Sequence, residues 1–194
     1  MELTEKKEDR RVRRTKKLLT QALTQLLQEK QVNEITVREL TDLADMNRGT
    51  FYLYYKDIYD MLEKIEDSMF SALNQIMDLH EKEAAGLQTR PLLLDLFHFI
   101  EENKEMVRVL LSPNGDINFL HRLFEVIREK CLHVFLALPD TQNESDFDYR
   151  YSFVVFGTAG LIRAWVSCDC REPADQMADL ADALIRQGSL NDLS

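Results

Sequence analysis

The chain has 194 residues and carries 24 Lys and Arg against 34 Asp and Glu, a formal net charge of −10. Hydrophobic residues make up 45% of the chain, and no apolar run approaches the roughly 20 residues that span a bilayer, which excludes general disorder and an integral membrane protein. Three cysteines are too few for a disulfide framework, and the charged N-terminal segment lacks a secretory signal, so we expect a cytoplasmic protein. Only six Gly and four Pro disfavour an all-β fold, which needs many turns.

The charge is unevenly distributed along the chain. Residues 1–60 hold twelve basic and eleven acidic side chains, whereas residues 61–194 hold twelve basic and twenty-three acidic ones. Eight of the basic groups fall within residues 6–17. A basic cluster of this kind is either a solvated terminus or a contact surface for a polyanion such as DNA. If it meets DNA, the acidic remainder of the chain should face away from the duplex.

Apolar residues recur at helical spacing along almost the whole chain. The pattern i, i+3 or i+4, i+7 predicts an all-α protein of nine helices. Thr36 and Glu39 have the spacing of a capping box, Asn47 is a favourable N-cap, and Pro91 suits a first helical turn. In chain order the predicted helices cover residues 12–30, 36–44, 48–54, 57–84, a segment from 91, 104–111, 116–138, 147–168 and a segment from 173.

Two of the connecting segments are also predicted. Residues 112–115 read as a turn, and residues 139–146 as a polar loop. The helix over residues 147–168 is apolar through most of its middle, so we expect it to be buried on nearly all sides.

The two short helices over residues 36–54 fit a helix-turn-helix motif. Its second helix can enter the major groove of DNA, which is about 12 Å wide. Phe51 should point inward because it is the strongest apolar residue of this segment, and Gly49 permits a close approach to backbone or phosphate. Arg48, Thr50, Tyr52 and Tyr54 can point outward. Alternatively, the tyrosines simply pack the small domain.

Residues 10–65 resemble the DNA-binding domain of the TetR/AcrR family of transcriptional regulators. The resemblance is carried by Ile35-Thr36-Val37-Arg38-Glu39-Leu40, by Ala44, and by the segment from Asn47 to Asp57. It implies an all-α fold with a helix-turn-helix domain over residues 8–56 and an effector-binding and dimerisation domain over residues 57–194. One position departs from the family pattern, since Ile58 stands where the family usually has a lysine. Lys56 could take over that phosphate contact.

The resemblance also implies which residues contact DNA. Thr36 and Arg38 match phosphate-contacting positions, and the start of the recognition helix supplies side chains that reach bases. The implied set is Thr36, Arg38, Arg48, Gly49, Thr50, Tyr52, Tyr54 and Lys56.

The segment from Tyr151 to Trp165 resembles the penultimate helix of a TetR subgroup of the dihydroxyacetone-kinase regulator type. In the family this helix and the last one form a four-helix dimer interface. The resemblance therefore implies a homodimer whose interface includes Gly157, Gly160, Leu161, Ala164, Leu180 and Leu184. The alternative is a core helix of a monomer. A dimer would also place two recognition helices at half-sites about 34 Å apart.

The family places an effector pocket between its fourth and eighth helices. A small-molecule effector of unknown identity could therefore bind among apolar residues at core-like positions, or these could be ordinary core residues. The candidates are Met69, Phe97, Phe119, Phe124, Ile127 and Phe156.

No constellation of an enzyme is present. The four histidines are scattered, and neither a metalloprotease, nucleophile-elbow nor phosphate-loop motif occurs. Cys168 and Cys170 could be half of a metal site, but no second cysteine pair or histidine cluster follows, so we expect no metal and no cofactor. A solvent-near thiol pair at a helix end, or a redox role, are the other interpretations.

These observations favour a sequence-specific DNA-binding regulator, a homodimeric repressor of palindromic operators that an effector releases. The alternative is a TetR-like coactivator or adaptor that binds a protein partner, which the missing lysine at Ile58 and the net charge of −10 leave open.

Overall fold

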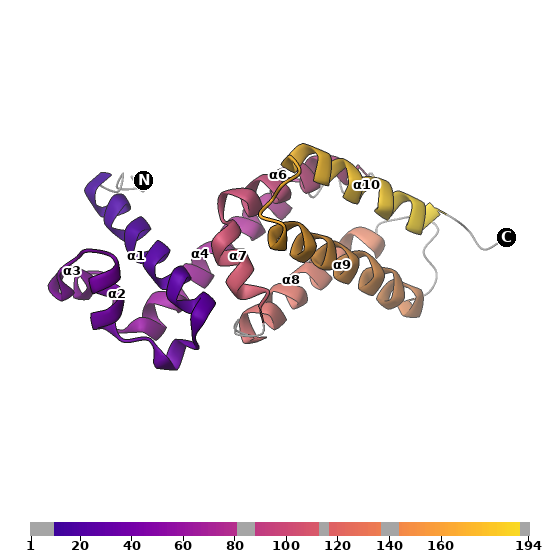
Figure 1. The fold of residues 1–194 in the computed structure, drawn as a ribbon. Helices are drawn as coiled ribbons and strands as arrows, with labels where there is room; N and C mark the ends of the chain where they lie inside the picture. Colours follow the sequence, from indigo (N-terminus) through magenta and orange to yellow (C-terminus); the bar gives the residue numbers. More distant parts are fainter. Residues whose placement is uncertain (1–9, 81–87, 113–116, 137–143, 191–194) are drawn as a thin grey trace, which may run out of the picture. The chain divides into compact units, whose positions relative to one another are not determined.

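The computed structural model describes residues 10–80, 88–112, 117–136 and 144–190. The regular structure in those residues is entirely helical, with nine α-helices and one 3-10 turn, so the all-α fold class is confirmed (Figure 1). No helix among them combines the length and apolar character that crossing a bilayer requires. The chain divides into two compact units, one ending at Asp67 and one beginning at Ser68.

The N-terminal unit contains α1 (Arg10–Glu29), α2 (Val37–Leu43), α3 (Arg48–Tyr52) and the start of α4 (Ile58–Leu79). A 3-10 turn, η1 (Val32–Glu34), joins α1 to α2. Helix α2 packs against both α1 and α3. These helices bury most of their predicted apolar faces, although Leu18 of α1 and Leu43 of α2 are 37% and 43% exposed. The side chains closed off from solvent are Leu19, Leu23, Leu27, Leu40, Phe51 and Met61.

Local hydrogen bonds fix where the short helices begin. The Thr36 hydroxyl accepts from the Glu39 backbone N–H at 3.2 Å and caps α2, which is one of the two hydrogen bonds of the predicted capping box. The Glu39 carboxylate accepts from Lys30 Nζ at 2.5 Å, and this pair joins α2 to the end of α1. The Asn47 side chain accepts from the Gly49 backbone N–H at 2.8 Å and caps α3, confirming that N-cap.

The C-terminal unit contains the rest of α4 and five further helices. They are α6 (Arg90–Glu102), α7 (Lys104–Leu110), α8 (Ile117–Leu136), α9 (Glu144–Ser167) and α10 (Ala174–Leu190). Helix α10 packs chiefly on α6, while α9 contacts α7, α8 and α10 (Figure 1). Pro91 lies in the first turn of α6, as predicted.

An aromatic pair is central to the core of this unit. The rings of Phe97 and Trp165 meet edge to face, with their centroids 5.3 Å apart, and both side chains are buried. Trp165 Nε1 donates to the Glu172 carbonyl oxygen at 2.9 Å, so the buried indole keeps a hydrogen bond.

The predicted connections between helices are only partly described by the structure, and one of them differs from it. The loop predicted over residues 139–146 is wrong at its end, because α9 already begins at Glu144. Its polar first turn resembles a loop in composition, yet acidic side chains favour a helix N-terminus. The turn predicted at 112–115 and the end of the helix predicted at 57–84 fall mainly outside the described residues.

Helix α9 is not buried on nearly all sides within a single chain, and that prediction is wrong. Tyr149, Phe153 and Phe156 are 78%, 65% and 55% exposed. Its buried face holds Trp165 and Val166, whereas its outer face carries apolar side chains that the described residues leave exposed. A contiguous exposed apolar surface of this kind usually marks a contact with another molecule.

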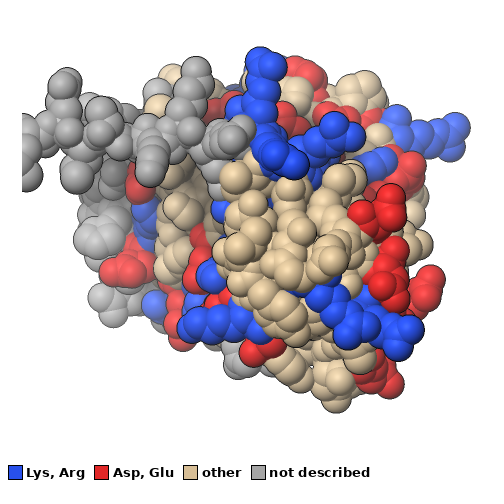
Figure 2. All heavy atoms as spheres, turned by 90° about the vertical axis from the view of Figure 1, so that its left-hand side faces the viewer, with Lys and Arg blue, Asp and Glu red and all other residues tan. Residues whose placement is uncertain are grey.

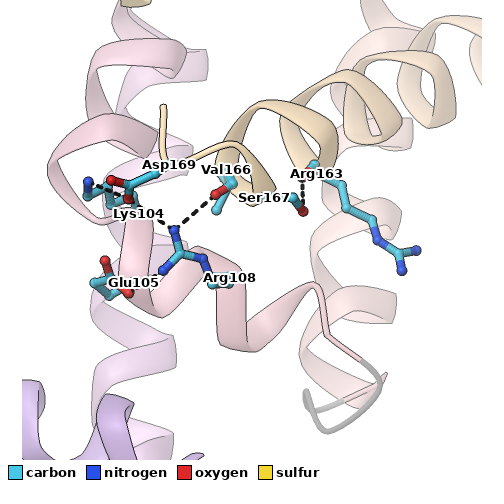
Figure 3. Close-up of polar contacts among 7 residues, drawn as sticks. All are labelled: Lys104, Glu105, Arg108, Arg163, Val166, Ser167 and Asp169. Atoms are coloured by element: carbon cyan, nitrogen blue, oxygen red, sulfur yellow. Dashed lines mark hydrogen bonds and ion pairs between the residues drawn. The ribbon is translucent and has the colours of Figure 1, made fainter. Parts of the chain in front are cut away.

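The turn between α9 and α10 is held by an ion-pair network that comes from α7 (Figure 3). The Asp169 carboxylate accepts from Lys104 Nζ at 2.8 Å and from Arg108 Nη2 at 3.2 Å. Arg108 also donates to the Val166 carbonyl oxygen at 3.0 Å and to Glu105 at 2.7 Å. The hydrogen bonds from Lys104 and Arg108 lower the pKa of Asp169.

The two cysteines flank this aspartate. Asp169 and Cys170 have φ of 59° and 53°, a left-handed conformation uncommon outside glycine. Cys168 is exposed and Cys170 is partly buried, and burial raises the pKa of the Cys170 thiol. No cluster of three or more His, Cys, Asp or Glu in the described ranges could hold a metal ion.

Asp169→Asn is expected to lower the melting temperature at neutral pH, because the amide cannot pair with Lys104 and Arg108 as an anion. The native pKa of Asp169 is depressed, so its contribution is present above the unfolded-state pKa of about 3.9 and is lost as pH falls through the native value. The difference from the parent protein should therefore close below about pH 4. Melting curves from pH 7 to 3 test this.

Glu125→Gln is the matched control, since it removes an exposed carboxylate from α8. It should melt like the parent protein at neutral pH. A deficit for Asp169→Asn that stays constant down to pH 3 would contradict a charge-dependent role for Asp169.

Candidate nucleic-acid interface

The two sides of α3 differ sharply in burial. Phe51 is fully buried, and its ring contacts those of Tyr52 and Tyr55 at centroid distances of 5.4 and 5.5 Å. On the other side, Arg48, Gly49 and Tyr52 are exposed. Residues four apart on a helix share a face, so Arg48 and Tyr52 lie on one surface of α3. Gly49 adds no side chain to that surface. The predicted inward orientation of Phe51 is confirmed.

The remaining predicted contact residues lie in the same unit. Thr36 and Arg38 are exposed at the start of α2, and Lys56 is exposed between α3 and α4. Thr50 and Tyr54 are half-buried. Lys16 of α1 lies 6.0 Å from the centre of the Tyr54 ring, which brings the basic helix to the end of α3.

The exposed surface of this unit is electrostatically divided. Arg10, Arg11, Arg13, Arg14 and Lys17 are exposed on the first turns of α1; Lys6 and Lys7 fall outside the described residues. Figure 2 shows the face at the α1–α3 end of Figure 1, with an uncharged centre, Lys and Arg above and below it, and Asp and Glu along its right-hand edge. Cations bordering an uncharged centre suit a DNA groove, whose phosphates flank the base edges.

Gly49 leaves room for the cap of α3. A Cβ built at Gly49 would lie 3.3 Å from Asn47 Oδ1, the atom that accepts the hydrogen bond from Gly49 N. A side chain here would therefore press on the cap oxygen, and it would also fill the exposed gap between Arg48 and Tyr52.

The junction between α3 and α4 contains a clamp, formed by Asp60 and Lys64, that sequence reasoning missed. Lys64 Nζ donates to the Tyr54 carbonyl oxygen at 3.1 Å and to Asp60 Oδ2 at 2.9 Å. Asp60 Oδ2 also accepts from the Lys56 backbone N–H at 2.9 Å. The hydrogen bond from Lys64, and to a smaller extent the one from the Lys56 backbone, lowers the pKa of Asp60. The i, i+4 spacing of Asp60 and Lys64 was the available signal.

Ile58, which stands where the family usually has a lysine, is a core residue in the structure. Its side chain is only 4% exposed and belongs to the core, so this position cannot supply a cation to phosphate. Lys56, two residues earlier, is exposed and forms no ion pair within the described residues. The clamp holds the backbone of Lys56 while its ammonium group remains available.

The predicted effector residues do not share one environment. Met69, Phe97 and Phe119 are buried, Phe124 and Ile127 are half-buried, and Phe156 is mostly exposed. Among these six side chains, the rings of Phe124 and Phe156 contact each other, with their centroids 5.2 Å apart. A hollow of about 160 Å³ involves none of the six, and its lining is Arg108, Leu111, Ser112, Arg163, Val166 and Ser167. In Figure 3 the Arg163 side chain extends away from the network around Arg108.

The predicted interface residues lie on the outer side of α9 and α10. Gly157, Gly160 and Ala164 are exposed, and Leu161 is half-buried. A Cβ at either glycine would meet nothing within 4 Å. Leu180 and Leu184 of α10 are 45% and 50% exposed. Tyr149 and Phe153, which the prediction omitted, extend the same α9 face by steps of four residues.

An all-α chain with a capped helix-turn-helix, an exposed face on its second helix and a separate helical unit defines a transcriptional regulator of the helix-turn-helix class. Residues 88–187 match the family model TetR_C_8, described as a transcriptional regulator C-terminal region. The chain belongs to the TetR family of transcriptional regulators, and it is accordingly not an enzyme.

A curated relative supports this membership. The uncharacterized HTH-type transcriptional regulator YxbF of Bacillus subtilis (strain 168) is 24% identical over 176 residues. The match covers 86% of this chain and 43% of that protein, so the chain spans less than half the length of that relative.

Solved structures share the fold at lower sequence identity. The fatty acid degradation regulator FadR from Bacillus halodurans superposes with a TM-score of 0.65 at 16% identity, covering 91% of this chain and 96% of that one. FadR from Bacillus subtilis in complex with stearoyl-CoA gives 0.61 at 16%, covering 89% and 98%. The dihydroxyacetone kinase operon activator DhaS gives 0.59 at 19%, covering 89% and 94%.

Proposed function

We propose that this chain is a homodimeric repressor that binds palindromic operator DNA through α3 and releases it when a small molecule binds the C-terminal unit. The observation that carries the proposal is the exposed face of α3, which rests on a fully buried Phe51 and is bordered by Arg48 and Lys56. A regulator of operators acts where the chromosome lies, so we place the protein in the cytoplasm.

The contact residues divide into two roles. Arg48 follows the Asn47 cap directly, at the end of α3 whose side chains reach base edges in a helix-turn-helix. Thr36, Arg38 and Lys56 border it from α2 and the start of α4, where contacts to phosphate fix the register of the protein on the duplex. The hydroxyls of Thr50, Tyr52 and Tyr54 complete the proposed surface.

The homodimer is supported by the uncovered outer face of α9 and α10. Glycine weakens a helix interior by about 1 kcal/mol relative to alanine, and none of the described residues lies close enough to Gly157 or Gly160 to require it. Two glycines three residues apart let a second helix approach closely. We propose that the same two helices of a second copy occupy this face.

The effector site is the most detailed part of the proposal. Phe124 and Phe156, whose rings are in contact, are the best supported of the predicted pocket residues, because neither is fully enclosed by the core. The FadR structure from Bacillus subtilis contains stearoyl-CoA, so an acyl-CoA is the first compound to test for release of operator DNA.

Selection from a random duplex DNA library at a fixed, physiological salt concentration tests the proposal. Enrichment of an inverted repeat is expected. Protein that is folded and dimeric but enriches no sequence would contradict operator binding, and it would favour the adaptor that binds a protein partner. Ile58, which replaces the usual phosphate-contacting lysine with a core residue, is the observation that supports that alternative.

Two substitutions separate the charged from the neutral contacts. Lys56→Ala should weaken operator binding and reduce the slope of log K against log salt concentration by about 0.9, the value for one lost phosphate contact. Tyr52→Phe removes a neutral hydroxyl, so it should weaken binding by about three- to tenfold without changing the slope. Fluorescence anisotropy at several salt concentrations measures both quantities.

Lys130→Ala is the control, since it removes one lysine from the C-terminal unit. Its salt slope should equal that of the parent protein. Unchanged affinity in both Lys56→Ala and Tyr52→Phe would refute the assignment of these contacts.

A further inference from the structure

We propose that Leu53 reads a thymine methyl group in the operator. The inference rests on the proposed function and names a specificity-determining residue within it. Leu53 is 75% exposed, directly after the last residue of α3. It lies outside the set of contact residues that the sequence predicted.

The backbone places Leu53 on the exposed face of α3. As the C-cap residue it has φ −68° and ψ −24°, which continues the helical path. It therefore follows Gly49 by one turn on the same face, beside Tyr52. Because Gly49 carries no side chain, no α3 side chain on that face stands between Leu53 and the start of the helix.

Within the part of the chain that the structure describes, this apolar surface is exposed. Tyr52 is 57% exposed, and its ring packs edge to face on the buried Phe51. The contact with Phe51 therefore fixes the position of the tyrosine ring next to Leu53. The carbonyl of Tyr54 is held by Lys64, which fixes the backbone immediately after Leu53. An exposed leucine on a backbone fixed from both sides is positioned for a contact.

The charge on the N-terminal unit identifies the partner. Arg38, Arg48 and Lys56 are exposed in the same unit, and Figure 2 shows Lys and Arg on two sides of an uncharged centre. A duplex has the complementary arrangement, with phosphates bordering the base edges. Among the groups that the bases present in the major groove, the apolar one is the C5-methyl of thymine.

Deoxyuridine substitution tests this contact directly, because it removes that methyl group and keeps the base pair. Each thymine of a selected half-site is replaced in turn, and the dissociation constant is measured for the parent protein and for Leu53→Ala. At one position the parent should lose about fourfold in affinity, the factor for burying one methyl group. Leu53→Ala should lose nothing there.

Leu43→Ala is the matched control, since Leu43 is an exposed leucine at the end of α2. This variant should keep the fourfold sensitivity. Circular dichroism of both variants should match the parent protein, because both side chains are exposed.

The outcomes separate this inference from the proposed function. Operator binding with no deoxyuridine-sensitive position, or a half-site without thymine, would overturn the role of Leu53 and leave the repressor intact. Sensitivity that persists in Leu53→Ala would overturn it too. Failure to select any operator would overturn both.

Discussion

Gly160→Leu is expected to convert the proposed dimer into a monomer while leaving the fold intact. Gly160 is exposed, and a Cβ at this position would meet nothing within 4 Å among the described residues, so we expect leucine to be accommodated in the single chain. Leucine also favours an exposed helix over glycine by several tenths of a kcal/mol or more. The monomer should therefore be at least as stable as before, and any loss must arise from the contact with a second copy.

The physical cause is the distance between helices. Packed helices lie about 8–10 Å apart depending on the side chains at the contact, and the closest approach needs glycine or another small residue. A leucine at Gly160, next to Gly157 and Ala164 on one face, would push the partner helix away. The apolar contacts of Leu180 and Leu184 would open with it.

The measurement combines mass and DNA binding. Light scattering should give twice 22.7 kDa for the parent protein and 22.7 kDa for the variant, with unchanged helix content. A monomer engages one half-site, so operator affinity should fall by about 100-fold or more with the loss of bivalent binding.

Gln75→Leu is the matched control, because it adds the same side chain at an exposed position of α4. It should remain dimeric. A Gly160→Leu protein that keeps the mass of a dimer would show that this face is not the interface.

The sequence predicted those features that depend on near neighbours. The helices, the Thr36 and Asn47 caps and the inward Phe51 follow from residues within one or two turns. The start of α9 was misplaced, since a polar first turn and a polar loop have the same composition.

Interactions between residues far apart in the chain could not be predicted. The Lys30–Glu39 pair, the bond from Lys64 to the Tyr54 carbonyl and the contacts of Arg108 with Val166 and Asp169 depend on how helices pack. These are the contacts that orient α2, the end of α3 and the α9–α10 turn.

The dependence on packing also explains why the prediction that α9 is buried on nearly all sides was wrong. Apolar composition shows that a surface must be covered, but it does not show whether the cover comes from the same chain. Trp165 is covered by its own core, whereas Phe153 on the same helix is 65% exposed. Leu53 was missed for the related reason that its exposure depends on where α3 ends.

Phe51→Ala is expected to abolish operator binding while the dimer persists. Phe51 is fully buried and supports both Tyr52 and Tyr55 through ring contacts. Truncating a buried phenylalanine to alanine costs about 3–5 kcal/mol. A core the size of the N-terminal unit supplies no more than about 3–5 kcal/mol, so this unit should be largely unfolded in the variant.

Hydrogen exchange resolves the effect along the chain. Peptides from α1 to α3 should lose their protection, while peptides from α9 and α10 should keep theirs, because the C-terminal unit has its own core around Phe97 and Trp165. The mass in solution should remain that of a dimer. Operator binding should be undetectable, since the exposed face of α3 exists only when Phe51 anchors it.

Leu53→Ala is the matched control two residues away, where the side chain is exposed. Its effect on stability should stay within about 0.5 kcal/mol, and α1 to α3 should stay protected. Unchanged protection of α1 to α3 in Phe51→Ala would contradict the central role of Phe51. Together the two variants separate a residue that forms the recognition surface from one that the surface presents to DNA.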